Sequence, residues 1–387
     1  MLGGDAAGSV GIVQREYYTF GSANEPFVLE GGGTLEEVVT CYEVYGTLNS
    51  SGDNAILIAH GLTGSSHAAG RFKPDSPYAG YWDRIIGKGR PLDTDRWCII
   101  APNALGGCRG STGPASPDPR TGKPYGSRFP TITIRDMVRA QRPLLDHLGV
   151  RRLRLVIGAS MGGMQAFEWA VTYPDIVDAI CPIGSSPIQS AQALAFNHCM
   201  RRAIMADPEW RNGDYYDGPG PRAGLAVARM IGHITYLCDD VMERKFGLRT
   251  STPISEPEPS DWTRFAMEEY LDEEGRLLVH RFDANAYMAV SRAIDLHDIG
   301  RERGGLAAAY RRIRARCLLI GISSDILFPP ESVRGVGEAM QAAGADATYW
   351  EMESNYGHDA FLEEQTKLGP PLLQLLSEIE TPLAAAR

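Results

Sequence analysis

Short apolar runs alternate with segments of helical periodicity along most of the chain. Val38–Tyr45 alternates like a strand, and the compact run Ala55–Ala59 ends at His60-Gly61. Further apolar runs predict strands at Trp97–Ala101, Leu153–Ile157, Val177–Ile183, Cys317–Ile322 and Ala347–Glu351. Strands that alternate with helices are typical of an α/β fold, in which helices cover both faces of a mostly parallel sheet.

Apolar residues at helical spacing predict helices over Thr133–Leu148, Met161–Tyr173 and Ser332–Ala343, followed by a C-terminal helix. The pattern changes between Ser186 and Ile299, where helical segments have few β-branched runs between them. Polar, Gly- and Pro-rich breaks occur there at Asp217–Pro221 and Ser251–Ser260. We therefore expect one α/β core, residues 1–185 and 300–387, interrupted by a helical lid over residues 186–299.

Charge and composition narrow the class of protein. The chain of 387 residues is 43% hydrophobic and 22% charged, as expected for a globular protein. Its formal charge of −10 argues against nucleic acid or an anionic membrane as a main partner. No apolar run is long enough for a membrane span, and residues 1–14 lack the basic start and apolar region of a signal peptide.

The cysteines and histidines form no recognisable metal or disulfide pattern. The seven cysteines are scattered and never form a C-x-x-C pair, and the eight histidines include no H-E-x-x-H sequence. We therefore expect reduced thiols, no bound metal and a cytoplasmic location.

The motif most suggestive of chemistry is Gly158-Ala159-Ser160-Met161-Gly162, between a predicted strand and a predicted helix. A serine in such a turn has its hydroxyl exposed, and the glycines let the strand and helix approach closely. The following backbone N–H, that of Met161, can then face a developing oxyanion. The alternative is a glycine-rich turn needed only for packing.

A serine nucleophile needs a base, and the base needs an acid to orient it. In enzymes built around such a turn, the acid and then the histidine follow the serine along the chain. Asp325 comes just after the predicted strand Cys317–Ile322, and His358 lies between the last strand and the last helix. A capping role for Asp325 remains an alternative, and His297 is the main competitor as base. The loop His60–Gly64 offers the Leu62 N–H as a second oxyanion donor, unless it is a plain glycine turn.

The chain also resembles the homoserine O-acetyltransferase family of α/β-hydrolase-fold enzymes. The resemblance is carried, in order, by HGLTGSSH, NALGGCRGSTGP, FPTITIRDM, GASMGGMQ, HITY, FDANAY, residues 297–305 and YGHDAFL. It implies a ping-pong reaction with acetyl-CoA as co-substrate and no permanently bound cofactor. It also implies a lid over a tunnel and a homodimer packed through that lid.

The same resemblance implies roles for residues outside the triad. Arg229 falls where the family holds the amino-acid carboxylate, and Tyr236 and Asp359 fall where it contacts the substrate, with Asp359 meeting the ammonium. Without the family, Arg229 would be read as a solvated arginine on a helix face. Leu327 stands where succinyl-using relatives tend to carry Arg, and an apolar side chain there suits an acetyl group.

Two departures from the family pattern leave the acceptor open. Gly61 stands where the family usually has Ala, and Leu237 where it often has Arg. L-homoserine is the expected acceptor, with L-serine or another alcohol as the alternative. A serine esterase of the same fold has the same triad. A non-catalytic binding protein is disfavoured because Ser160, Asp325 and His358 are all present.

Overall fold

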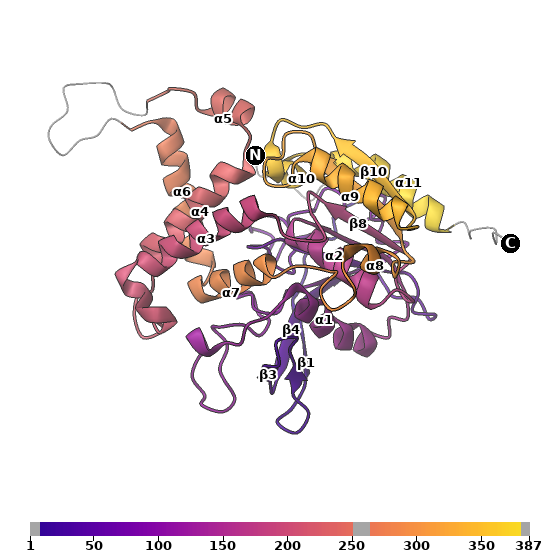
Figure 1. Cartoon of the computed structure of the whole chain (residues 1–387), viewed down its shortest axis with the longest axis horizontal. Helices are drawn as coiled ribbons and strands as arrows, with labels where there is room; N and C mark the ends of the chain where they lie inside the picture. The colour runs from indigo at the N-terminus through magenta and orange to yellow at the C-terminus, as the bar shows by residue number, and fades with distance from the viewer. Residues whose placement is uncertain (1–7, 251–263, 381–387) are drawn as a thin grey trace.

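The computed structural model describes residues 8–250 and 264–380, and most of its strands form one mixed sheet (Figure 1). The sheet order is β1-β4-β6-β5-β7-β8-β9-β10, with β1 and β4 antiparallel to their neighbours and the pairings from β6 to β10 parallel. The strands are β1 Glu16–Phe20, β4 Val38–Tyr45, β5 Ala55–Ala59, β6 Cys98–Pro102, β7 Leu153–Ala159, β8 Ala179–Ile183, β9 Arg316–Ile322 and β10 Ala347–Met352, and a separate hairpin pairs β2 Phe27–Val28 with β3 Thr34–Leu35.

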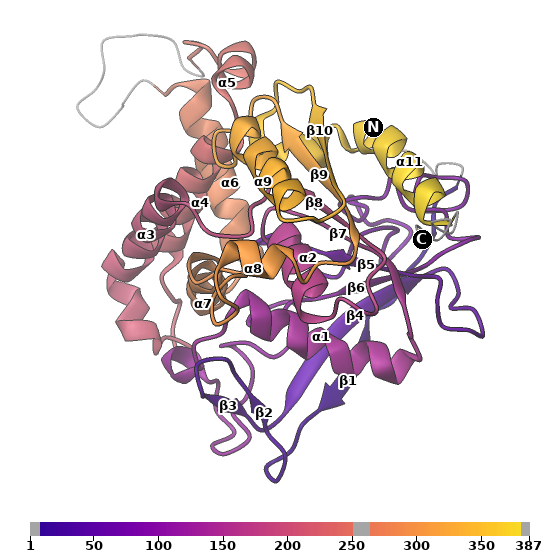
Figure 2. The same cartoon turned by 45° about the vertical axis from the view of Figure 1, so that its right-hand side comes forward.

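Helices cover the sheet and form a second body beside it (Figure 2). The α-helices are α1 Ile134–Leu148, α2 Met161–Thr172, α3 Ala191–Ala206, α4 Arg222–Tyr236, α5 Asp239–Lys245, α6 Ala266–Arg281, α7 Ala284–Asp295, α8 Leu306–Tyr310, α9 Pro330–Ala342, α10 Ala360–Glu363 and α11 Gly369–Glu380. Short 3₁₀ helices are η1 Gly126–Arg128, η2 Pro208–Gly213, η3 Gly357–Asp359 and η4 Gln365–Leu368.

The central strands are buried on both faces. In β5, Ala55 and Leu57 pack on the side covered by α1, α2 and α9. The alternate residues Ile56 and Ile58 pack on the opposite side with Trp82 and the apolar face of α11. Because strand side chains alternate between faces, a strand covered on both faces reads as an unbroken apolar run, which is how β5 reads in the sequence.

The expected α/β fold is confirmed, and the predicted strands and helices lie within two residues of their observed ends. The prediction missed β1 and the hairpin of β2 and β3. No residue of β1 is fully buried, and its neighbour β4 covers only one edge. An exposed edge strand has no continuous apolar run to mark it in the sequence.

Between β8 and β9 the chain leaves the sheet and forms α3 to α7, which we call the lid (Figure 1). Helix α4 packs against both α3 and α6, and it also contacts η3 of the core. The predicted break at Asp217–Pro221 separates η2 from α4, whereas that at Ser251–Ser260 lies outside the described residues. The exact domain boundaries, 1–185, 186–299 and 300–387, stay a prediction.

No helix in the described ranges is both long and apolar enough to cross a membrane.

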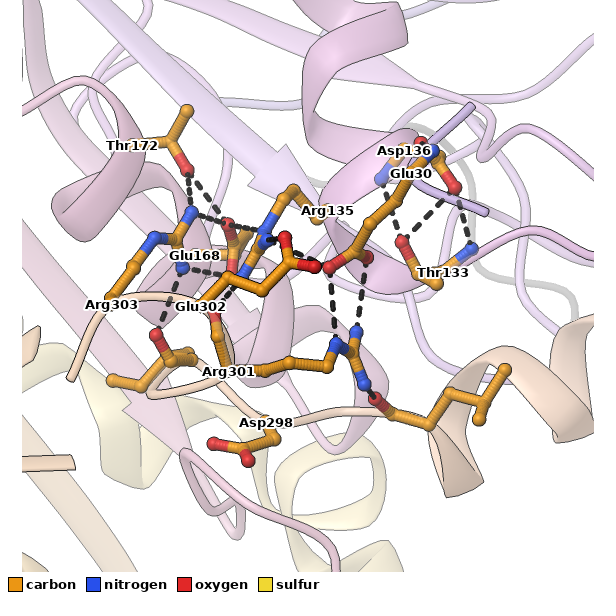
Figure 3. A network of polar contacts seen from close by, with 12 residues as sticks. Glu30, Thr133, Arg135, Asp136, Glu168, Thr172, Asp298, Arg301, Glu302 and Arg303 are labelled. Carbon is orange, nitrogen blue, oxygen red and sulfur yellow. Dashed lines mark hydrogen bonds and ion pairs between the residues drawn. The ribbon is translucent and has the colours of Figure 1, made fainter. Parts of the chain in front are cut away.

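A network of ion pairs ties the end of the lid to the core (Figure 3). Glu168 of α2 is 1% exposed and contacts both Arg135 of α1 and Arg303, which follows α7. Arg301, two residues before Arg303, donates two hydrogen bonds to Glu30, at 3.1 and 3.0 Å. The network therefore joins α1, α2 and the segment that returns from the lid.

We predict that Glu168→Ala lowers the free energy of unfolding by about 3 kcal/mol, because Arg135 and Arg303 would stay buried without their shared carboxylate. Urea denaturation followed by circular dichroism measures the change. Arg314→Ala is the matched control, since Arg314 and Asp175 form an ion pair whose side chains are 72% and 73% exposed. The control should lose little stability. Equal losses in both variants would contradict a special role for the network.

Candidate active site

Ser160 occupies a strained turn between β7 and α2. Its backbone has φ 56° and ψ −124°, an unfavourable conformation for a residue with a side chain. A Cβ on Gly162 would lie 2.0 Å from the Ala59 carbonyl oxygen, and one on Gly158 would lie 2.5 Å from the Gly162 backbone. Only glycine fits at both positions. The turn therefore presents Ser160 above the ends of β5 and β7, as the motif predicts.

Two backbone amides near Ser160 are unused. Within the described part of the chain, neither the Leu62 N–H nor the Met161 N–H donates a hydrogen bond. The side chain of His60 orients the Leu62 amide. His60 Nε2 accepts from the Ala104 N–H at 2.9 Å, so Nδ1 carries the proton and donates to the Gly61 carbonyl at 2.7 Å. In a trans peptide the N–H points opposite to the carbonyl, so the Leu62 N–H points away from His60.

Burial keeps His60 neutral, which this arrangement requires. Loss of solvent around the imidazole lowers the pKa of His60 to about 4. A protonated ring could not accept from Ala104. Leu62 and Met161, the expected oxyanion hole, therefore each offer a backbone N–H that is free of described partners, and His60 orients that of Leu62. The sequence did not reveal this role of His60.

His358 and Asp325 meet at the carboxyl ends of β9 and β10. His358 Nδ1 lies 2.7 Å from Asp325 Oδ2, and both side chains are buried. The other oxygen, Asp325 Oδ1, accepts from the backbone N–H groups of Leu327 and Phe328 at 2.8 and 2.9 Å. Because these bonds fix the carboxylate, Nδ1 of His358 is the donor and Nε2 presents its lone pair. Nε2 is buried and has no hydrogen-bond partner among the described residues.

The electrostatics of this pair suit a general base. Burial on its own would lower the pKa of His358, but the charge of Asp325 and its hydrogen bond outweigh burial and raise that pKa above its ordinary value. Ser160 and His358 line the same cavity, whereas the competing His297 does not. His297 is buried where the lid returns to the core, and burial lowers its pKa to about 4. The geometry therefore favours His358 as the base.

The cavity above Ser160 has a volume of about 430 Å³, and the lid helices α4 and α6 form part of its wall. Its wall includes all three residues that the resemblance assigns to the substrate, Arg229, Tyr236 and Asp359. Arg229 and Tyr236 come from α4, and Asp359 comes from η3 beside His358. Gly357 allows this contact between lid and core, because its φ is +66° and a Cβ there would lie 2.5 Å from the Tyr236 carbonyl oxygen.

Arg229 is held inside the cavity and is not a solvated arginine. Its side chain is 12% exposed, its guanidinium lies 5.8 Å from the centre of the Tyr236 ring, and Nη2 is 3.3 Å from Glu274 Oε2. Nε is buried without a partner among the described residues. The guanidinium thus has an unused donor for a further anion. Burial raises the pKa of Asp359 on the other side, although the charges of His358, His233 and Arg229 oppose the rise.

Glu274 is a site residue that the sequence did not reveal. It comes from α6 and contacts Arg229 and also His233, whose Nε2 is 2.9 Å away. Burial would raise the pKa of Glu274, but these two partners lower it to about 2, so it is a carboxylate. Arg229 and His233 are four residues apart and share one face of α4. That spacing was the available signal, but nothing in the sequence indicated that α6 would lie opposite. Arg109 and Arg281, also missed, line the cavity as well.

The positions that depart from the family pattern are placed differently. Gly61 lines the cavity, and a Cβ there would lie 3.9 Å from the Ser160 Cβ, an ordinary contact. Leu237 is buried under α5.

Leu327 is not among the residues that line the cavity, and its side chain packs against the core. Its backbone holds Asp325, while its expected role in choosing the acyl donor stays a prediction.

Comparison with known proteins agrees with this geometry. Residues 54–365 match the alpha/beta hydrolase fold family. The chain is 50% identical to the homoserine O-acetyltransferase of Symbiobacterium thermophilum, over 95% of this chain and 96% of the relative. It is 48% identical to that of Moorella thermoacetica, over 97% and 99%.

Two solved structures have nearly the same fold. The homoserine O-acetyltransferase of Bacillus anthracis gives a TM-score of 0.88 at 29% identity, covering 94% of this chain and 98% of that one. Esterase E22 gives 0.87 at 31% identity, covering 94% and 100%. With half of its residues shared over nearly the full length of curated relatives, the chain belongs to the homoserine O-acetyltransferase family of α/β-hydrolase-fold proteins.

Proposed function

We propose that the protein transfers an acetyl group from acetyl-CoA to the hydroxyl of L-homoserine through an acetyl-Ser160 intermediate. The observation that carries the proposal is the placement of Arg229 and Asp359 in the cavity that also contains Ser160 and His358. A zwitterionic amino acid needs a cation for its carboxylate and an anion for its ammonium. Hydrolysis by water needs neither, so the pair supports transfer to an amino acid.

In the first half-reaction, His358 Nε2 takes the Ser160 proton while Oγ attacks the thioester carbonyl carbon. The oxyanion that forms is stabilised by the N–H groups of Leu62 and Met161. The carbon–sulfur bond then breaks, and the CoA thiolate takes the proton from His358. In the second half-reaction, His358 takes the proton of the acceptor hydroxyl, whose oxygen attacks the acetyl carbon. Collapse releases the ester, and the Ser160 oxygen recovers the proton.

Esterase activity is the second candidate, since esterase E22 has the same fold with a TM-score of 0.87. An acetyl-serine intermediate can be attacked by water as well as by an alcohol. L-serine is an alternative acceptor, because Gly61 leaves room beside Ser160 that an alanine methyl would occupy.

We also propose that the protein is a cytoplasmic homodimer that packs through its lid. Exposed apolar side chains lie on the lid helices, and they include Leu194, Met205, Val227, Ile234 and Leu277. Burial of such side chains against a second copy would remove them from water. All seven cysteines lie within the described residues and are free, which fits a reducing compartment.

The function is tested by measuring CoA release from acetyl-CoA with L-homoserine, L-serine or water as the sole acceptor. We expect steady turnover with L-homoserine, less with L-serine and little with water. Ser160→Ala, the matched control, should abolish all turnover. Fastest release with water as acceptor would identify an esterase and overturn the proposal.

Asp325→Asn should lower kcat/KM by about four orders of magnitude, because the amide no longer selects the His358 tautomer with a free Nε2. The base must be neutral, so activity in the parent falls as pH drops through the raised pKa of His358. Without the carboxylate, burial dominates and lowers that pKa, which moves the acid limb of the pH–rate profile to lower pH. An acid limb at the same pH in both proteins would show that it belongs to another group.

Arg229→Gln should raise the KM for L-homoserine about thirtyfold or more, since a buried contact between guanidinium and carboxylate is worth about 2 kcal/mol or more. The rate of Ser160 acetylation by acetyl-CoA, followed as a burst of free CoA without acceptor, should change little. Arg222→Gln, at the exposed start of α4, is the control. An unchanged KM in Arg229→Gln would remove Arg229 from the acceptor site.

A further inference from the structure

Two arginines of the cavity wall have no part in the mechanism described above. Arg109 lies in the loop after β6, and Arg281 is the last residue of α6. Arg281 donates to the Thr63 carbonyl oxygen at 3.0 Å, beside the oxyanion loop. Arg109 Nε is buried and has no hydrogen-bond partner among the described residues. Neither guanidinium forms an ion pair with a described carboxylate.

Within residues 8–250 and 264–380, Arg281 and Arg109 lack a counter-ion because the neighbouring carboxylates, Asp283 and Glu274, contact other groups. Asp283 lies two positions after Arg281 in the sequence. Its N–H donates at 3.3 Å to Sγ of Cys108, the residue before Arg109. Asp283 Oδ1 accepts from Tyr215, however, and Oδ2 accepts from Tyr216 and from the Ala286 N–H. The other nearby acid, Glu274, is held by Arg229 and His233.

The arginines of the cavity wall act on one another electrostatically. Burial lowers the pKa of Arg281 to about 10, and the positive charges of Arg229 and Arg109 lower it further. Burial also lowers the pKa of Arg109, with a further contribution from Arg15. Arg15 is 30% exposed and stacks on Phe72, which is itself on the surface.

A desolvated cation without a counter-ion is costly, and two side by side are costlier. On a protein with a formal charge of −10, they form a local site for an anion. The amino-acid acceptor brings one carboxylate, and Arg229 takes it in the proposed mechanism. The donor brings the remaining negative charge, since its thioester is joined through a pantetheine arm to a nucleotide with three phosphates.

We propose that Arg281 and Arg109 bind the phosphate groups of the acyl donor, while Arg229 binds the acceptor. The inference rests on the proposed function. Ser160, Thr63, Arg281 and Arg109 line the same cavity, so a donor whose thioester carbon lies at Ser160 would extend its arm along Thr63 toward the two guanidiniums. Arg281 and Arg109 then contribute to recognition of the donor and not to the chemical step.

The test compares acetyl-CoA with S-acetyl-pantetheine, which has the same arm and thioester but no phosphate. In Arg281→Gln and Arg109→Gln, kcat/KM for acetyl-CoA should fall about tenfold or more, as expected for a lost charged hydrogen bond. The value for S-acetyl-pantetheine should change less than about twofold, because it makes no such bond. Acetyl-dephospho-CoA as a third donor separates the 3′-phosphate from the pyrophosphate. Arg276→Gln is the control, on the same helix but 57% exposed.

Equal losses with both donors would overturn the proposal, because they would indicate damage to the fold or to the oxyanion loop. A changed KM for L-homoserine with an unchanged burst of thiol release would also overturn it. Arg281→Lys keeps the positive charge and should retain part of the preference for acetyl-CoA. A parent enzyme that acetylates L-homoserine but uses both donors equally well would refute the phosphate site and leave the transferase function intact. No turnover by the parent with any donor would refute the function itself.

Discussion

The close packing of β5, β7 and α2 around Ser160 is the constraint on which the site depends. A serine with φ 56° has an unfavourable backbone conformation. The close backbone packing of Gly158, Gly162 and Ala59 around it holds the turn in this conformation. The same packing leaves the Met161 N–H unpaired at the first position of α2, where a helix has free amides in any case. One tight turn therefore presents the hydroxyl and one of the two amides proposed to stabilise the oxyanion.

The lid helices contribute charged side chains to the cavity, and the core contributes Ser160 and His358. The proposed triad and oxyanion donors come from loops at the ends of β5, β7, β9 and β10, whereas Arg229, Tyr236, Glu274 and Arg281 come from α4 and α6. The ion pairs of Glu168 and Glu30 anchor the segment that returns from the lid, directly against the helix that carries Met161 (Figure 3). The proposed acceptor site thus lies between two bodies that the network holds together.

This division explains why the same fold includes both acetyltransferases and esterases. The likeness to esterase E22 and to the homoserine O-acetyltransferase of Bacillus anthracis is nearly equal in TM-score, because the fold and the serine turn are common to both. In the proposed function, what separates transfer from hydrolysis is the environment of the second substrate. Arg229 and Asp359 in the cavity wall would position an amino-acid hydroxyl against the acetyl group.

The sequence determined the parts of this protein that depend on local pattern. Strands buried on both faces read as apolar runs, and Gly158-Ala159-Ser160-Met161-Gly162 is a short-range motif whose geometry follows from its own glycines. The order of Ser160, Asp325 and His358 along the chain was readable for the same reason, since each follows a predicted strand. The tertiary structure alone decided which residues from separate helices meet. Glu274 pairs with Arg229 only because α6 packs on α4, and the tautomer of His60 depends on the Ala104 N–H, 44 positions away. The backbone N–H of Leu327 donates to Asp325 Oδ1 at 2.8 Å, a contact that the sequence did not show, and the role of Leu327 in choosing the acyl donor stays a prediction. Contacts between distant segments depend on how whole elements pack, and no local pattern of residues encodes them.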